Sequence, residues 1–189
     1  MSTIKEIHKK LKNLGLSVTD RPTETVGQYT FTKYDEGYRK IVTKVEIQSG
    51  LGALSKKEYW ENLGKSTLAY KYGRCFGLAA VAGEQLKGIA KSKGLAMYQA
   101  AVIGRDHHIV VLSESVRPVK PKKVSLIMAK TQEKFGYELL DNDIVVDLWQ
   151  YVISGKTYDL AAEAKYHRYT KKGTGDDGLA KVVFLCRIV

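Results

Sequence analysis

At 189 residues the chain is long enough to bury a hydrophobic core, and its length is typical of a single domain. An apolar fraction of 44% argues against global disorder, and two cysteines are too few for a disulfide framework or a cysteine-based zinc site. The formal net charge of +11 comes from scattered lysines rather than a basic block, which disfavours nucleic acid as a partner and favours an acidic protein or membrane surface.

The first third of the chain is predicted to hold two helices and one strand. Ile4, Ile7, Leu11 and Leu14 recur at helical spacing before Gly15, which is typical of an amphipathic helix that ends at the glycine. Three further segments follow: a polar, turn-rich stretch over 19–37, a β-branched strand over 38–47, and a helix over 56–63 with Ser55 and Glu58 at capping-box spacing.

The clearest helix prediction begins at Cys75 and runs to about Lys91. This segment is rich in Ala, Leu and Gln, and its apolar stripe is made by Leu78, Ala82, Leu86 and Ile89. Residues 97–103 and 108–112 then predict two strands of a hairpin, joined by the turn at 104–106.

The last third is predicted to alternate strands and helices. Its segments are a helix over 122–135 (with 124–128 as an alternative strand), strands over 143–149 and 151–153, a helix over 159–169, a loop over 173–178 and a final strand over 182–189. This order predicts an α+β fold with a mostly antiparallel sheet. We expect one domain over 1–189, with an N-terminal extension at 1–63 and a core at 64–189.

Cys75 lies where the turn Tyr72-Gly73-Arg74 gives way to the predicted helix. Backbone N–H groups at a helix start stabilise a thiolate and can hold the oxyanion of an acyl intermediate. A free cysteine is more often an inert core residue, and Cys186, in the apolar terminal strand, is interpreted in that way. The context of Cys75 favours a nucleophile as much as a core residue.

Two adjacent histidines, His107 and His108, precede an apolar run. Neighbouring side chains of a strand point to opposite faces, so one imidazole should point inward. An imidazole at the edge of a strand can act as a general base. We favour His108, because it directly heads the apolar run, and keep His107 as the alternative.

Asp147 interrupts the run Ile144-Val145-Val146-Asp147-Leu148-Trp149, where a carboxylate is costly unless it is paired. Paired with a histidine, it would fix the tautomer and stabilise the imidazolium. The alternative is an aspartate that caps a turn at the end of a strand. Cys75, His108 and Asp147 are thus the predicted catalytic residues.

No metal and no cofactor is predicted. Because His107 and His108 are adjacent, their two rings do not easily reach one ion, and the sequence lacks the EF-hand, P-loop and dinucleotide-binding fingerprints.

The order of these motifs resembles that of papain-like bacterial effector and toxin domains, which include cysteine proteases and glutamine deamidases. The segment 73–79 (Gly-Arg-Cys-Phe-Gly-Leu-Ala) resembles their Gly-x-Cys-x-x-x-Ala helix start. The segments 108–112 and 145–149 resemble their His-x-Phe-Val-Val and Val-x-Asp-Pro-Trp strands. The resemblance covers roughly 73–156. It implies a papain-like fold, with an antiparallel sheet packed against a central helix that starts at the nucleophilic cysteine.

The same resemblance leaves the oxyanion donor open. The papain-type glutamine about six residues before the cysteine is missing, because position 69 is alanine. Besides the Cys75 backbone N–H, the candidate donors are therefore Gln99 and Asn62.

These residues lead to the hypothesis of a thiol hydrolase that acts on protein amides through Cys75, His108 and Asp147. Glutamine deamidation, proteolysis and amine cross-linking share one acyl-enzyme, so the triad does not distinguish them. The alternatives are a non-catalytic basic module that binds nucleic acid or an acidic protein, and an inactive relative that keeps the fold.

The expected partners are a protein substrate with an acidic surface and an acidic inhibitor or immunity protein. No apolar run reaches the roughly 18 residues of a membrane span, and the N-terminus lacks the apolar block of a cleavable signal peptide. The resemblance to effectors implies a virulence protein that resides in the bacterial cytoplasm and is then secreted into a target cell without such a signal.

Overall fold

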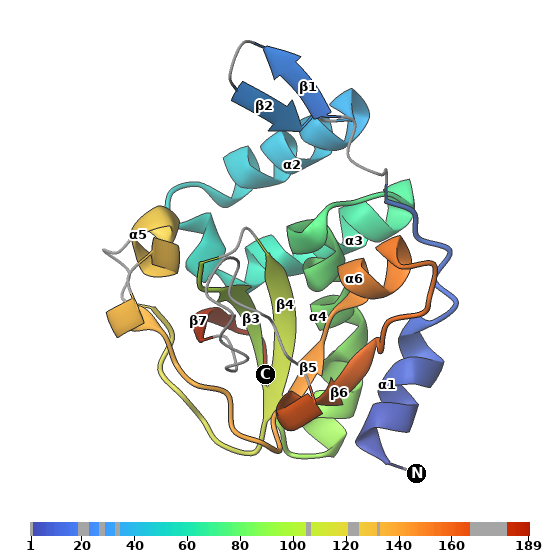
Figure 1. Cartoon of the computed structure of the whole chain (residues 1–189), viewed down its shortest axis with the longest axis vertical. Helices are drawn as coiled ribbons and strands as arrows, with labels where there is room; N and C mark the ends of the chain where they lie inside the picture. The colour runs from blue at the N-terminus through green and yellow to red at the C-terminus, as the bar shows by residue number, and fades with distance from the viewer. Residues whose placement is uncertain are drawn as a thin grey trace.

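The fold is α+β and is built around one antiparallel sheet of five strands in the order β6-β5-β4-β3-β7 (Figure 1). A computed structural model describes residues 2–18, 23–26, 29–32, 35–104, 107–120, 125–131, 133–166 and 181–189. Mixed helix and sheet with antiparallel pairing confirms the predicted fold class.

The helices and strands have the following bounds. The helices are α1 (Thr3–Leu11), α2 (Glu36–Ser49), α3 (Lys57–Tyr70), α4 (Cys75–Ser92), α5 (Leu126–Thr131) and α6 (Leu148–Ile153), with 3-10 turns at Ala53–Ser55, Glu133–Phe135 and Ala164–Tyr166. The strands of the main sheet are β3 (Ala96–Val102), β4 (His108–Ser113), β5 (Ile144–Val146), β6 (Ala161–Glu163) and β7 (Val182–Arg187). A separate two-stranded sheet is formed by β1 (Thr23–Val26) and β2 (Tyr29–Thr32).

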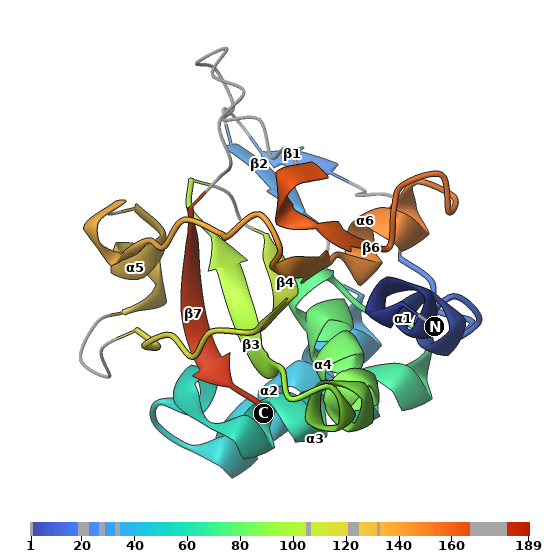
Figure 2. The same cartoon turned by 90° about the horizontal axis from the view of Figure 1, so that it is seen from below.

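The central helix α4 covers one face of the sheet, and α3 packs against it (Figures 1 and 2). The two helices approach closely at Gly64, where a Cβ atom would lie 2.5 Å from the carbonyl oxygen of Ala80. Gln99 reaches from β3 into α4 and donates a 2.9 Å hydrogen bond to the Ala79 carbonyl. The predicted helix from Cys75 and the predicted β3–β4 hairpin are both confirmed.

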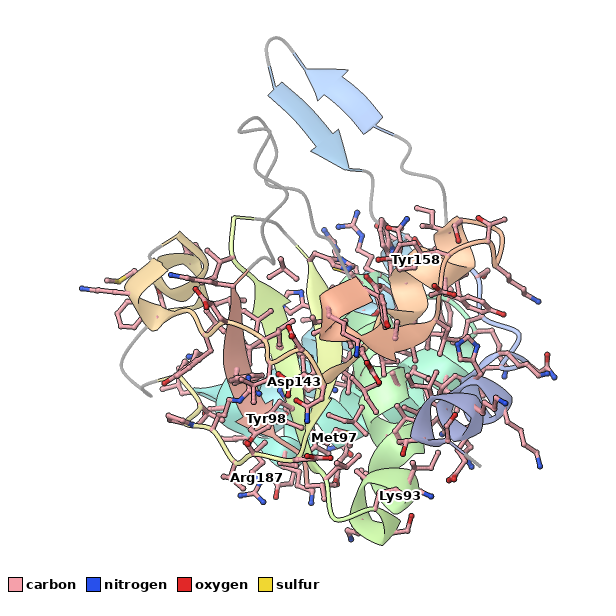
Figure 3. The ribbon with its side chains drawn as sticks, turned by 60° about the horizontal axis from the view of Figure 1, so that its bottom comes forward. Lys93, Met97, Tyr98, Asp143, Tyr158 and Arg187 are labelled. Carbon is pink, nitrogen blue, oxygen red and sulfur yellow. The ribbon has the colours of Figure 1, made fainter. Side chains whose placement is uncertain are left out.

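The opposite face of the sheet is covered by the chain between β4 and β5. The Arg117 side chain bonds both carboxylate oxygens of Asp143, at 2.7 and 2.5 Å, while the Arg117 backbone N–H donates to the Tyr98 hydroxyl at 2.7 Å. Figure 3 shows Tyr98 and Asp143 on this face. Asp143 is only 1% exposed, so this ion pair holds the connecting segment on the sheet.

The predicted strand over 38–47 is wrong, because these residues belong to α2. Asp35 caps the helix by accepting a 2.7 Å hydrogen bond from the Tyr38 N–H. Tyr38, Val42 and Val45 are buried on one side of the helix, at helical spacing. The stretch 19–37, expected to be polar and turn-rich, contains β1 and β2.

The predictions around Asp147 and after it need correction. Strand β5 ends at Val146, and the predicted strand over 151–153 is part of α6. The predicted helix over 159–169 is wrong for its described residues, because β6 pairs with β5 and is followed by a 3-10 turn. Residues 167–169 and the predicted loop over 173–178 lie outside the described residues.

The other helix predictions hold with changed ends. The helix predicted over 56–63 continues to Tyr70, but the expected capping box is absent, since the Ser55 hydroxyl donates to the Gly52 carbonyl instead. Within the predicted helix over 122–135, α5 covers only Leu126–Thr131 of the described residues.

The expected boundary between residues 63 and 64 falls inside α3. Ile7 of α1, Tyr38 of α2 and Leu63 of α3 belong to the same cluster of buried residues as α4 and the sheet. In the part of the chain that the structure describes, no helix combines the length and apolar character needed to cross a membrane.

Candidate active site

Cys75 is the first residue of α4, at the end of the helix that meets the start of β4. The first hydrogen bond within the helix runs from the Leu78 N–H to the Arg74 carbonyl, at 2.8 Å. The N–H groups of Cys75, Phe76 and Gly77 precede this bond, in the turn where N–H groups have no acceptor within the helix. The Cys75 side chain is partly exposed, so the sulfur lies at a positive helix end that reagents can reach.

The structure pairs Asp147 with His107, whereas the sequence favoured His108. The Asp147 Oδ2 atom lies 2.7 Å from His107 Nε2, and its Oδ1 atom accepts a 3.0 Å hydrogen bond from the Gln150 N–H. The Asp147 side chain is fully buried, and that of His107 is 12% exposed. Asp147 thus both caps α6 and orients an imidazole.

His107 is linked on its other side to the thiol. Burial by itself lowers the pKa of His107, but hydrogen bonds to Asp147 and to Cys75 outweigh it and raise the pKa from 6.5 to about 9. The His107 ring also packs against the Trp149 ring, with 5.5 Å between centroids. Cys75, His107 and Asp147 therefore form one connected relay of thiol, imidazole and carboxylate.

His108 contacts the same sulfur from the sheet. Its Nδ1 atom lies 3.8 Å from Cys75 Sγ, and its ring packs between Trp60 and Phe76, at centroid distances of 6.4 and 6.3 Å. As the first residue of β4 it has the same alternation as Val110, which faces α4. The prediction that His108 points inward agrees with this position, but its ring is held by aromatic packing rather than by Asp147.

Strand alternation does not separate the two imidazoles, because it applies only inside the strand. His107 precedes β4, so its side chain reaches the same gap as that of His108. The sequence did contain a usable signal, since Asp147 and Gln150 stand at the spacing of an N-cap and the third helical residue. Because α6 begins at residue 148, Asp147 is the N-cap of a helix, and its side chain does not follow the alternation of the strand before it.

Neither of the two side chains named as candidate oxyanion donors is placed to bind a substrate oxyanion. The Gln99 carboxamide is buried and donates to the Ala79 carbonyl inside the core, so it is held away from a substrate. Asn62 lies on the exposed side of α3. The backbone N–H groups at the start of α4 are the donors nearest the sulfur.

Cys186 is more deeply buried than Cys75. It is 4% exposed, and burial raises its pKa to about 11. This agrees with its interpretation as a core residue. Among the described residues, no cluster of His, Cys, Asp and Glu could hold a metal ion.

Comparison of the chain with known protein families, with characterised proteins and with solved structures finds no match in any of the three.

Proposed function

We propose that this protein is a thiol hydrolase of papain-like type, with Cys75 as nucleophile, His107 as base and acid, and Asp147 as the residue that orients His107. The observation that supports this most directly is the 2.7 Å bond between Asp147 and His107, whose ring also bonds the thiol at a helix start. His107 replaces His108 as the base in this proposal.

The relay supports an ion pair as the resting form. A His107 pKa near 9 keeps the imidazole protonated at neutral pH, and its charge favours the thiolate form of Cys75. The N–H groups at the start of α4 add to that preference.

The chemistry follows from this ion pair. The Cys75 sulfur attacks the amide carbonyl carbon, and the carbonyl oxygen becomes an oxyanion that the Cys75 N–H can bind. The C–N bond then breaks, and the departing nitrogen takes the proton from His107. Water attacks the thioester and gives a proton back to His107, while the thiolate leaves and the ion pair forms again.

The substrate is a protein amide, with glutamine deamidation and proteolysis as the two favoured outcomes and cross-linking by an amine as a third. The net charge of +11 favours a partner with an acidic surface, either the substrate or an inhibitor. We place the protein among effectors or toxins that are secreted into a target cell, on the resemblance of its motifs alone.

Selective alkylation tests the thiolate. Iodoacetamide at pH 6, followed by peptide mass mapping, should label Cys75 at least about tenfold faster than Cys186, because Cys75 is partly exposed at a helix start beside the His107 imidazolium, whereas Cys186 is buried and burial raises its pKa. Equal, slow labelling of both cysteines would contradict the proposal.

Intact-mass spectrometry of candidate target proteins then tests the reaction. Deamidation adds about one dalton and proteolysis gives fragments, and Cys75→Ser should abolish either change. The matched control is Cys186→Ser, which should leave the reaction unaltered.

A further inference from the structure

A hollow lies beside α6, the helix that Asp147 caps. It lies between the C-terminal end of α1 with the following loop and the side of α6, two elements that are neighbours in Figure 2. Its volume is about 370 Å³, which falls within the usual range of ligand pockets. Neither Cys75 nor His107 lines it.

The walls of the hollow are mixed, with more apolar than polar surface. Leu11 and Leu14 contribute from the α1 side, and Leu148 and Val152 contribute from α6. A mainly apolar hollow of this size accepts a large aliphatic or aromatic side chain, and burying such a group provides specific binding.

Both walls are connected to the proposed catalytic residues. Leu148 directly follows Asp147, and the hollow is lined by residues of α6 and by Gly155 and Lys156 just after it. On the other side, Ser17 forms a parallel bridge with Tyr72, in which the Ser17 N–H donates to the Lys71 carbonyl at 2.9 Å. The Gly73 N–H donates to the Ser17 carbonyl at 3.3 Å, two residues before Cys75. The hollow is therefore connected to the proposed catalytic residues through α6 and through the bonds of Ser17 to the loop before Cys75.

The charge around the hollow has one sign. Lys12 and Lys156 are exposed at its rim, and no acidic residue is found among the described residues that line it. Two ammonium groups beside a mainly apolar hollow favour a ligand that carries carboxylates next to an apolar group.

We propose that this hollow is a specificity site that binds a segment of the substrate protein in which a large apolar side chain is flanked by Asp or Glu. The inference rests on the proposed function, since it assigns the substrate class of that same site. The apolar side chain enters between α1 and α6, and Lys12 and Lys156 contact the neighbouring carboxylates.

Peptide selection tests the proposal without any chemistry at the thiol. The full chain carrying Cys75→Ala is immobilised, and a phage-displayed library of random dodecapeptides is selected on it. We expect enrichment of peptides in which Leu, Ile, Phe or Trp neighbours Asp or Glu. Fluorescence anisotropy then measures the affinity of the selected peptides for variants of the same protein.

Two variants test the hollow by different means. Val152→Trp fills it, and Lys12→Glu with Lys156→Glu reverses its rim charge, and each should weaken peptide binding by about tenfold or more. The matched control is Lys40→Glu with Lys44→Glu, two exposed lysines of α2, which should change affinity less than about twofold. If circular dichroism shows that Val152→Trp is unfolded, the exposed lysine pair decides the outcome.

Absence of enrichment, or equal binding by the hollow variants and the Cys75→Ala protein, would overturn the proposal. Binding of decanoate in place of any peptide would also overturn it, because the occupant would then be a fatty acid. The hydrolase proposal is tested separately, by iodoacetamide labelling of the unsubstituted chain. Its failure can therefore be distinguished from failure of the peptide-binding proposal.

Discussion

At the level of single residues, the neighbouring imidazoles of His107 and His108 differ in what holds them. Asp147 and Cys75 bond the His107 ring, whereas the rings of Trp60 and Phe76 pack against His108. His107 thus interacts with both the carboxylate and the thiol, and His108 Nδ1 lies 3.8 Å from the same sulfur.

Exchanging each histidine for asparagine tests which imidazole activates the thiol. His107→Asn should slow iodoacetamide labelling of Cys75 at pH 6 by about tenfold or more, because the charge that stabilises the thiolate is lost. Turnover of a protein substrate should fall by about 10²- to 10⁴-fold. His108→Asn is the matched control and should change labelling less than about threefold. A larger loss in His108→Asn would reverse the assignment.

The raised pKa of His107 also predicts how stability depends on pH. A group whose pKa rises from 6.5 to about 9 on folding stabilises the native state fully below pH 6.5, and this contribution is lost as pH rises through 9. Asp147→Asn should therefore lower the free energy of unfolding by about 1–3 kcal/mol at pH 6 and by much less at pH 9.5. Because asparagine can still cap α6, the loss of unfolding free energy is due to the missing negative charge beside His107.

Urea denaturation of both proteins at several pH values measures this difference. His8→Asn, at a partly exposed position of α1, is measured in the same way as the control for a histidine outside the relay. A difference that grows between pH 6.5 and 9 would contradict the sign of the prediction.

Much of the candidate site could be predicted from the sequence. Cys75 was placed at a helix start by the change from glycine-rich turn to alanine-rich run, and the carboxylate at the end of an apolar run pointed to a paired Asp147. The choice between adjacent histidines could not be made, because it depends on where β4 begins and on which ring the carboxylate of a different segment reaches. Both are tertiary properties.

At the level of elements, a buried ion pair between Arg117 and Asp143 holds the segment between β4 and β5, and no sequence pattern predicted it. Asp143 belongs to the polar turn Asp141-Asn142-Asp143, but it is only 1% exposed and bonds Arg117. Its Oδ2 atom also accepts a hydrogen bond from the Leu140 N–H at 2.8 Å. Removing one partner of such a pair leaves a buried charge unpaired.

Asp143→Ala should therefore reduce the free energy of unfolding by about 3–5 kcal/mol. Replacing both partners, as Arg117→Leu with Asp143→Leu, should recover a large part of that loss, because no unpaired charge remains. Urea denaturation of the three proteins measures both effects. A double variant less stable than Asp143→Ala would show that the pair contributes more than charge compensation.

The start of α4 depends on a close approach at Gly77. A Cβ atom there would lie 3.0 Å from Tyr38 Cζ and closer still to the hydroxyl oxygen, which also bonds Thr67 Oγ1 at 3.3 Å. Gly77→Ala should cost about 1–3 kcal/mol of stability, since the buried tyrosine must shift. Adding Tyr38→Phe should restore part of the thermal stability measured by circular dichroism, because it removes the clashing atom.

The element predictions that failed are those where local preference opposed tertiary packing. Val42 and Val45 favour a strand by their branched side chains, but the buried positions of α2 follow helical spacing. Ala161 and Ala162 favour a helix, but they pair with Val146 and Val145 in the sheet. The long helix α4 and the β3–β4 hairpin were predicted correctly because local preference and packing agree there.

At the level of the whole molecule, the net charge of +11 is the basis of the alternative hypothesis, a non-catalytic basic binding module. The two hypotheses differ in salt dependence. We expect only weak binding to a 20-base-pair DNA duplex, falling steeply between 50 and 200 mM salt, as for nonspecific phosphate contacts. Fluorescence anisotropy of labelled duplexes measures it. Tight, sequence-dependent binding that survives Cys75→Ala would favour the binding module.

The bridge between Ser17 and Tyr72 has a consequence for limited proteolysis. Lys12 and Asn13 are exposed, so trypsin can cut beside a segment that supports the loop before Cys75. Such a nick would leave every member of the relay intact, yet it would release the neighbour that aligns Gly73. If the proposed activity were lost after this cleavage, the cause would be misalignment of the loop before Cys75 and not the loss of a catalytic side chain.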